Sequence, residues 1–331
     1  MATIKEVKIT KNGEMVTPIT IIDSVKNPDG SKYKDQVLTL LSEIAKNTIP
    51  LNWTRISQSR LTATIMSICY GNDKFVASDN ANNMAYSYDG ITWDAINQSI
   101  STTYIMTICY GYGKFVAGGD DGKMAYSYDG ITWNAIDQSI FTTNIRSIGY
   151  GNGRFVAVGA GGKMAHSSDG ITWNPIDQSI FAGVITSVCY GANKFVAVGH
   201  DGKMAYSSNG ITWNAINTSI FDTNLVFGVC YGNGLFIACA TGNTLAYSSN
   251  GGTNWVKAES LPSSLDVKQL CYGNGKHFAV CNLGRIAYTT NGSTWDYITT
   301  SAISNTYFMC YGNGKFIIGG TAGTMAYSIN G

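Results

Sequence analysis

The sequence predicts an all-β protein in which seven copies of a four-stranded unit close into a ring. A Tyr-Gly pair recurs at steps of 40, 40, 40, 41, 41 and 39 residues, at Tyr70, Tyr110, Tyr150, Tyr190, Tyr231, Tyr272 and Tyr311. Each copy holds four short strand-like runs separated by turn residues such as Asn152-Gly153 and Asp129-Gly130. Hydrophobic residues make up 44% of the chain, enough to bury a core, and no helical segments alternate with the strands. Four strands in about 40 residues, repeated in tandem, are typical of the blades of a β-propeller.

The two ends of the chain are predicted to share the seventh blade. Six of the seven tryptophans follow a Tyr-Gly pair inside the same repeat, whereas the last repeat ends at Gly331, before its tryptophan. The missing piece matches residues 51–58, in which Trp53 aligns with Trp133. We therefore expect residues 51–58 to form the outermost strand of the seventh blade, beside three strands from the C-terminal end. This strand exchange protects edges that an open ring would leave unpaired, and it gives a propeller domain of residues 51–331.

A short box follows the third strand of most repeats. The segment from Ser127 to Trp133 reads Ser-Tyr-Asp-Gly-Ile-Thr-Trp, and related segments end at Trp93, Trp173, Trp213, Trp255 and Trp295. The box resembles the Asp-box of sialidase-like propellers, Ser-x-Asp-x-Gly-x-Thr-Trp, although most copies here are one residue shorter. We expect Asp129 to accept backbone N–H groups in the turn and Trp133 to pack beneath the hairpin. The resemblance implies that this turn lies away from the ligand face, so the box identifies architecture and not chemistry.

Cysteine and histidine do not suggest a metal site. Six of the eight cysteines share one repeat position, Cys69, Cys109, Cys189, Cys230, Cys271 and Cys310, with Gly149 in the third repeat. We expect buried free thiols there, with disulfides or metal ligation as the alternative. His166 replaces a repeated tyrosine and is expected to pack, whereas His277 either occupies a phenylalanine position or marks a shift of register. No second ligand is spaced for a metal, and no cofactor is expected.

The loops divide between two faces of the predicted ring. The Tyr-Gly hairpins and the box turns share one face and vary little. The loops between second and third strands share the other face with the blade-to-blade connections, and they vary. Aromatic, amide and hydroxyl side chains there can stack on a sugar and bond its hydroxyls, and near-identical repeats over residues 71–220 suggest several equivalent weak sites. The candidate ligand-binding residues are Asn80, Asn83, Asp120, Asp121, Phe141, Arg146, Phe181, His200, Asp201 and Phe221. The alternative is plain solvated loops, with the phenylalanines tucked between blades.

Composition excludes several classes of function. The net charge of +1 argues against a nucleic-acid partner, and the absence of a long apolar run argues against membrane insertion. A glycosidase needs two carboxylates at fixed separation, but Glu259 is the only glutamate of the propeller. Asp120, Asp121 and Asp201 could be proposed, yet they are copies of a repeating turn. We therefore expect no enzyme activity, and keep a glycan hydrolase and a protein-interaction scaffold as alternatives.

Residues 1–50 do not repeat and are predicted to form a separate attachment or oligomerisation module. Short strands or extended arms are expected between Ile4 and Ile22, a turn at residues 27–30 and an amphipathic helix over residues 35–46. This module resembles the N-terminal segments of tail-fibre and receptor-binding proteins of phages and phage-like bacteriocins. The resemblance implies attachment to a tail, baseplate or fibre protein, often as a homotrimer, while the propeller binds a cell-surface glycan. The resemblance also implies a virion location with synthesis in the cytoplasm, which fits first residues that lack the apolar stretch of a signal peptide.

Overall fold

The computed structural model describes the backbone of residues 4–11 and 14–22, and residues 52–329 apart from 99–102, 138–139, 218–219, 260 and 262–264. Its contacts separate residues 1–50 from the rest of the chain. In the first unit, β1 (Ile4–Lys11) pairs antiparallel with β2 (Glu14–Ile22), where the sequence predicts strands. The predicted turn at 27–30 and helix at 35–46 lie outside the described residues.

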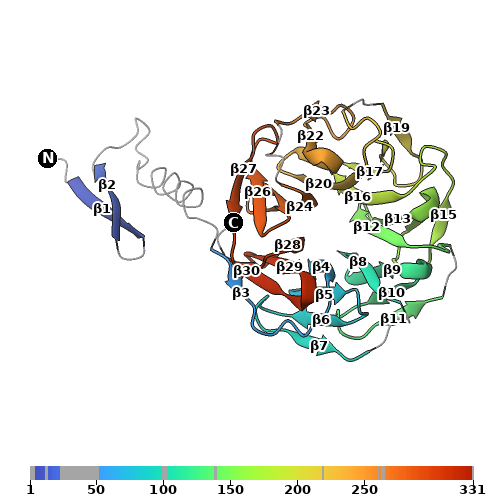
Figure 1. Ribbon diagram of the computed structural model, residues 1–331. Helices are drawn as coiled ribbons and strands as arrows, with labels where there is room; N and C mark the ends of the chain where they lie inside the picture. The colour runs from blue at the N-terminus through green and yellow to red at the C-terminus, as the bar shows by residue number, and fades with distance from the viewer. Residues whose placement is uncertain are drawn as a thin grey trace, which may run out of the picture. The chain divides into compact units, whose positions relative to one another are not determined.

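The second unit is a ring of seven four-stranded antiparallel sheets, which confirms the predicted β-propeller (Figure 1). From the innermost strand outward, the first three blades are β4 (Ile65–Gly71), β5 (Lys74–Asp79), β6 (Met84–Ser87) and β7 (Asp94–Ile96); β8 (Ile105–Gly111), β9 (Lys114–Gly119), β10 (Met124–Ser127) and β11 (Asn134–Ile136); and β12 (Ile145–Gly151), β13 (Arg154–Gly159), β14 (Met164–Ser167) and β15 (Asn174–Ile176). The next three are β16 (Ile185–Gly191), β17 (Lys194–Gly199), β18 (Met204–Ser207) and β19 (Asn214–Ile216); β20 (Val226–Gly232), β21 (Leu235–Ala240), β22 (Thr244–Ser248) and β23 (Val256–Lys257); and β24 (Val267–Gly273), β25 (Lys276–Cys281), β26 (Arg285–Thr289) and β27 (Asp296–Thr299). Four short 3-10 turns lie between second and third strands: η1 (Asp120–Gly122), η2 (Ala160–Gly162), η3 (Thr241–Asn243) and η4 (Thr321–Gly323).

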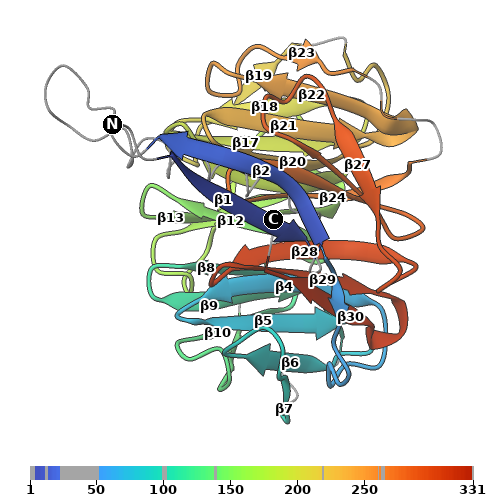
Figure 2. The same ribbon diagram turned by 90° about the vertical axis from the view of Figure 1, so that its left-hand side faces the viewer.

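The seventh blade combines the two ends of the propeller domain, as the sequence predicts. Its inner strands are β28 (Thr306–Gly312), β29 (Lys315–Gly320) and β30 (Met325–Ser328), and its outermost strand is β3 (Thr54–Arg55). Residue Thr54 pairs with Tyr327, and the amide of Ile56 donates to the carbonyl of Met325 at 2.8 Å. Blue β3 lies against red β30 in Figure 1, and Figure 2 shows β28 and β4 next to each other from the side. The seventh blade therefore has four paired strands, like the other six.

The Tyr-Gly pair locks each blade to the next. A Cβ atom on Gly151 would lie 2.0 Å from Cγ of Tyr190 in the following blade, so only glycine leaves room for that ring. The same relation holds at the closing interface, where Cβ on Gly312 would lie 2.1 Å from Cγ of Tyr70. The other five pairs repeat it: Gly71 with Tyr110, Gly111 with Tyr150, Gly191 with Tyr231, Gly232 with Tyr272, and Gly273 with Tyr311. One steric rule thus explains the repeat that identifies the fold.

The hydrophobic core lies between neighbouring blades. Val76 of one blade and Phe115 and Trp133 of the next belong to one buried cluster, and the equivalent phenylalanines are fully buried. Burying a side chain of this size contributes about 1.5–3 kcal/mol. In the sixth blade His277 occupies the phenylalanine position, because it pairs with Tyr272 as Phe236 pairs with Tyr231. The register at His277 is the same as in the other blades, which resolves the two alternatives for this histidine.

The repeated cysteines lie on the inner strands, and all eight thiols are free. The Sγ atom of Cys69 contacts the carbonyl of Tyr70 at 3.8 Å. Burial raises the pKa of Cys69 to about 12, and it raises the pKa of Cys189 and Cys271 to the same level. These thiols are therefore protonated at neutral pH and are poor nucleophiles and metal ligands. Among the described residues, no group of three or more His, Cys, Asp or Glu is placed to hold a metal ion.

Candidate functional site

Hydrogen bonds at opposite ends of the strands define two faces of the ring. The Nζ atom of Lys74, at the β4–β5 hairpin, donates to the carbonyl of Asp129 in the next blade's box at 2.5 Å, and Lys114 donates to Asp169 at 2.6 Å. We call this side, made of the hairpins and the box turns, the box face. On the other side, the amide of His200 donates to the carbonyl of Val184 at 3.0 Å. This side, made of the loops between second and third strands and the blade-to-blade connections, is the connection face.

The box residues are engaged in their own turns. Backbone amides of Ile131 and Thr132 donate to Oδ1 of Asp129 at 2.8 and 2.7 Å, and the Ser127 hydroxyl donates to the same oxygen at 2.9 Å. Burial by itself raises the pKa of Asp129, but these hydrogen bonds outweigh it and hold the pKa at about 2. Asn209 receives the equivalent amide bonds in the fourth blade. An amide can replace the carboxylate, so the box has a turn-forming role that needs no acid.

A cavity of about 600 Å³ lies at the centre of the ring, at the connection-face ends of the inner strands. All seven inner strands contribute to its lining. The second residue of the inner strands varies most among the blades, the third residue varies as well, and the Tyr-Gly pair at the end of each strand is constant. At the second position the lining holds Met66, Met106, Arg146, Thr186, Phe227 and Lys268. Variation is thus concentrated at two adjacent strand positions that line one shared space.

The third residue of several inner strands is polar and ties one blade to the next. Ser67 accepts the amide of Ile108 at 3.0 Å, and Ser147 accepts that of Val188 at 3.2 Å. Gln269 accepts the amide of Met309 at 2.5 Å. Each serine accepts through its oxygen, so its own O–H hydrogen is left for another acceptor. The cavity wall therefore combines apolar surface with hydroxyl and amide groups.

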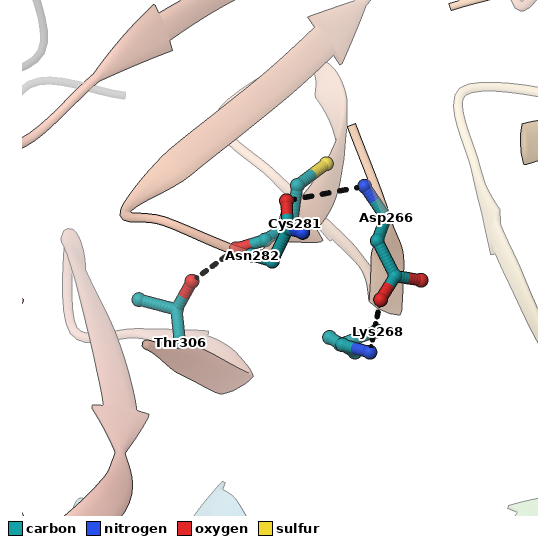
Figure 3. Close-up of polar contacts among 5 residues, drawn as sticks. All are labelled: Asp266, Lys268, Cys281, Asn282 and Thr306. Atoms are coloured by element: carbon teal, nitrogen blue, oxygen red, sulfur yellow. Dashed lines mark hydrogen bonds and ion pairs between the residues drawn. The ribbon is translucent and has the colours of Figure 1, made fainter. Parts of the chain in front are cut away.

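Two basic side chains, Arg146 and Lys268, and one histidine, His200, line the cavity. Arg146 is exposed on β12, and His200 is exposed on the loop between β17 and β18. Lys268 on β24 pairs with Asp266 at 2.5 Å, as Figure 3 shows. The amide of Asp266 donates in turn to Oδ1 of Asn282 at 3.2 Å. In the same close-up the Thr306 hydroxyl donates to the carbonyl of Cys281 at 2.7 Å, which ties the seventh blade to the sixth.

Two of the ten predicted ligand-binding residues, Arg146 and His200, line the central cavity. Asp120, Asp121 and Asp201 lie on the connection face outside it. Asp121 and Asp201 have φ of 52° and 56°, as expected of turn residues. Asp201 also lines a separate cavity of about 360 Å³ beside the fourth blade. The aspartates are therefore not brought together with Arg146.

The predicted amides hold the first blade together. The side-chain oxygen of Asn80 accepts the amide of Thr64 at 3.0 Å. The side-chain nitrogen of Asn83 donates to Asp79 at 2.9 Å and to the Thr62 hydroxyl at 3.1 Å. These contacts fasten the loop after β5 to the segment that leads from β3 into β4. A local structural role thus accounts for both amides.

The three predicted phenylalanines require a correction. Phe141, Phe181 and Phe221 are 3%, 5% and 0% exposed, and each belongs to a core cluster between blades. Their rings are not available to stack on a sugar, because burying them against neighbouring aliphatic groups is what anchors each blade-to-blade connection. They do not belong to the candidate site.

Sequence reasoning missed Asp79, a buried carboxylate. It accepts the amides of Thr62 and Ala63 at 3.0 Å and those of Ala81 and Asn83 at 2.9 Å. Burial raises its pKa, but the bonds from Asn83, Thr62 and Ala81 together prevail, and the pKa lies below its ordinary value. An aspartate at the end of β5, where most of the other blades have glycine or alanine, is the signal that could have indicated it.

The comparisons with known proteins identify the fold alone. No protein-family model matches the chain, and no curated protein matches it in sequence. Virginiamycin B lyase from Staphylococcus aureus, solved as a catalytically inactive variant with quinupristin, is similar in structure with a TM-score of 0.74 and 9% identity, covering 84% of this chain and 99% of that one. YCF48 bound to D1 peptide has a TM-score of 0.69 and 16% identity, covering 86% and 98%. YCF48 from Cyanidioschyzon merolae has a TM-score of 0.66 and 13% identity, covering 83% and 98%.

Among the described residues, no helix is long and apolar enough to cross a membrane.

Proposed function

We propose that the propeller is a non-enzymatic recognition domain that binds a cell-surface glycan at the connection face, with the central cavity as its main site. The observation that carries this proposal is the concentration of sequence variation at the cavity wall. The fold requires the same inter-blade contacts seven times, and the Tyr-Gly pairs meet that requirement without variation. Variation at the second residue of the inner strands is therefore not needed for closure, and it shapes the space that these residues enclose.

The chemistry of the wall suits a sugar. The half-buried ring of Phe227 offers an apolar face against which the C–H groups of a sugar can stack. Serine hydroxyls and the Gln269 amide offer hydrogen-bonding groups beside it. An aromatic platform with a few converging polar groups is typical of small-molecule and sugar sites.

We further propose that the chain is a receptor-binding protein of a phage or phage-like particle, at a tail fibre or tail tip. Residues 1–50 would attach it to a tail, baseplate or fibre protein, as a homotrimer. The support is the resemblance of this segment to such attachment segments, together with its separation from the propeller. The Asp-box resemblance of the propeller fits a domain that turns its box face away from the ligand.

Glycan hydrolysis is the weaker alternative at this cavity. Hydrolysis by the common mechanism uses two carboxyl groups at the scissile bond. The lining of the central cavity contains no aspartate or glutamate among the described residues. We therefore propose binding without turnover.

A protein-interaction scaffold is a second candidate, and exposed tyrosines on the box face favour it. Tyr88, Tyr112 and Tyr128 are 58%, 65% and 58% exposed in the first two blades. The third and fourth blades form the same box turn with Ser168 and Ser208 in place of Tyr88 and Tyr128. The fold does not need these rings, and exposed aromatic side chains are enriched at protein interfaces.

The test is a glycan array probed with the full chain and two variants. Phe227→Thr introduces the residue that Thr186 supplies at the same position of the fourth blade, and Tyr128→Ser is the matched change on the box face. We expect glycan binding that falls at least about 10-fold in Phe227→Thr and is unchanged in Tyr128→Ser, with both variants folded by circular dichroism. No glycan bound by the wild type, or loss only in Tyr128→Ser, would contradict the proposal.

A further inference from the structure

We infer that the central cavity is an anion-recognising site, so that the glycan bound there carries a carboxylate or sulfate group. This inference rests on the proposed function, whose ligand class it narrows. The observation behind it is the charge of the cavity wall, which is positive, whereas the chain as a whole is almost neutral.

The chain as a whole is balanced, with 22 lysines and arginines against 21 aspartates and glutamates. The charged residues of the cavity lining are Arg146 and Lys268, and among the described residues it holds no carboxylate. Acids and bases are almost equal in number in the whole chain, whereas both charged residues of the lining are basic. In a recess partly shielded from water, such a set attracts an anion more strongly than it would on an open surface.

Arg146 is the main anchor. Its position on the inner strand is occupied by methionine in the first two blades, so a charge there is not needed for folding. Within the part of the chain that the structure describes, no carboxylate lies within ion-pair distance of its guanidinium, and the side chain is exposed. A guanidinium presents two parallel N–H donors that match a carboxylate or sulfate group. The guanidinium is therefore open to pair with an anionic group of a ligand.

Lys268 provides a second cationic point, partly neutralised by Asp266. The side chains of Lys268 and Asp266 are 32% and 59% exposed, and Lys268 lines the cavity whereas Asp266 does not. Because Asp266 already offsets part of this charge, we expect Lys268 to contribute less than Arg146.

Neutral donors complete the site. Ser67 and Ser147 accept amides of the following blades through their oxygens, which leaves their hydroxyl hydrogens to donate to an anionic oxygen. Since these hydroxyls are fixed by the inner strands, they are held in place before the ligand arrives. Guanidinium, ammonium and hydroxyl donors on rigid strands are suited to an acidic sugar.

The experiment compares the full-length wild type with Arg146→Met, Lys268→Met and Lys257→Met. Arg146→Met introduces the residue of the first two blades, and Lys257→Met removes a charge from the exposed outer strand β23, away from the cavity. The proteins are applied to an array of carboxylated, sulfated and neutral glycans, and inorganic sulfate is titrated by calorimetry. We expect acidic glycans to bind, with a loss of about 10- to 100-fold in Arg146→Met, a smaller loss in Lys268→Met and less than about 2-fold in Lys257→Met. Sulfate binding is expected to weaken in the same order.

The possible failures are distinguishable. Binding of neutral glycans that Arg146→Met leaves unchanged would overturn the anion site and leave glycan recognition standing. Sulfate binding that Arg146→Met abolishes, without any glycan bound on the array, would support the anion site and overturn the glycan proposal. Equal sulfate binding by the wild type and Arg146→Met would overturn the inference whatever the array shows.

Discussion

Gly151 tests whether the Tyr-Gly repeat sets the spacing of the blades. In Gly151→Ala the new Cβ would lie 2.0 Å from Cγ, 2.2 Å from Cδ1 and 2.6 Å from Cβ of Tyr190. Carbon atoms in contact prefer about 3.5–4.0 Å, so the tyrosine must move by about 1.5 Å or the blades must separate. Gly151 does not have a positive φ, so the effect is steric and not a matter of backbone conformation.

The expected cost follows from overpacking. Inserting a methyl group into a well-packed core destabilises a protein by about 1–3 kcal/mol, and occasionally more. For a domain near this size, each kcal/mol lowers the midpoint of heat unfolding by about 2–4 °C, so we expect a fall of about 2–12 °C. Gly312→Ala should behave alike, because its Cβ meets Tyr70 at 2.1 Å across the closing interface.

Two glycines provide matched controls in the same unfolding experiment, followed by near-ultraviolet circular dichroism. A Cβ on Gly183 meets its nearest atom at 3.5 Å, so Gly183→Ala should be almost neutral. A Cβ on Gly153 meets nothing within 4 Å, but its φ of +70° makes alanine cost about 1 kcal/mol. A Gly151→Ala protein that unfolds at the same temperature as Gly183→Ala would refute the steric account of the repeat.

Three further predictions concern stability. Burial lowers the pKa of His277 to about 4, so the folded state favours the neutral imidazole. The free energy of unfolding should therefore fall by up to about 3 kcal/mol as the pH falls from about 6.5 to 4. In His277→Phe the midpoint of denaturant unfolding should change less over this pH range. Asp79→Asn places an NH₂ group among donors and should cost about 1–3 kcal/mol in urea unfolding; an unchanged midpoint would mean that its five hydrogen bonds do not fasten the loop. A chain lacking residues 1–58 loses β3 and exposes the edge of β30, so it should aggregate in size-exclusion chromatography, whereas a chain lacking residues 1–50 should not.

The fold was predictable because every blade of a propeller makes the same contacts with its neighbours, so the same residues recur in the sequence. The spacing of the Tyr-Gly pairs indicated the number of blades, and the displaced Trp53 located the strand β3 that completes the seventh. The spacing of the repeats did not show why each blade needs both a tyrosine and a glycine at this position. The two residues of each contact, such as Gly151 and Tyr190, belong to different repeats, and their proximity appears only when the blades are placed side by side.

The candidate site was only partly predictable for a related reason. The cavity takes one or a few residues from each inner strand, so residues about 40 positions apart in sequence converge there. The comparison of loops between repeats identified Arg146 and His200. It did not identify Phe227 and Lys268, which are the second residues of the inner strands of the fifth and sixth blades. Phe141 was expected on the surface, but its ring is buried. The sequence of a connecting loop does not show whether an aromatic ring points outward or into the core.

The central claim is that ligands are recognised at the connection face and not at the box face. The most direct measurement is a crystal structure of the full chain with a glycan selected on the array. We expect the ligand in the central cavity, with an anionic oxygen of the sugar within hydrogen-bond distance of the Arg146 guanidinium. A ligand lying instead on Tyr88 and Tyr128, with the central cavity filled only by water, would contradict it.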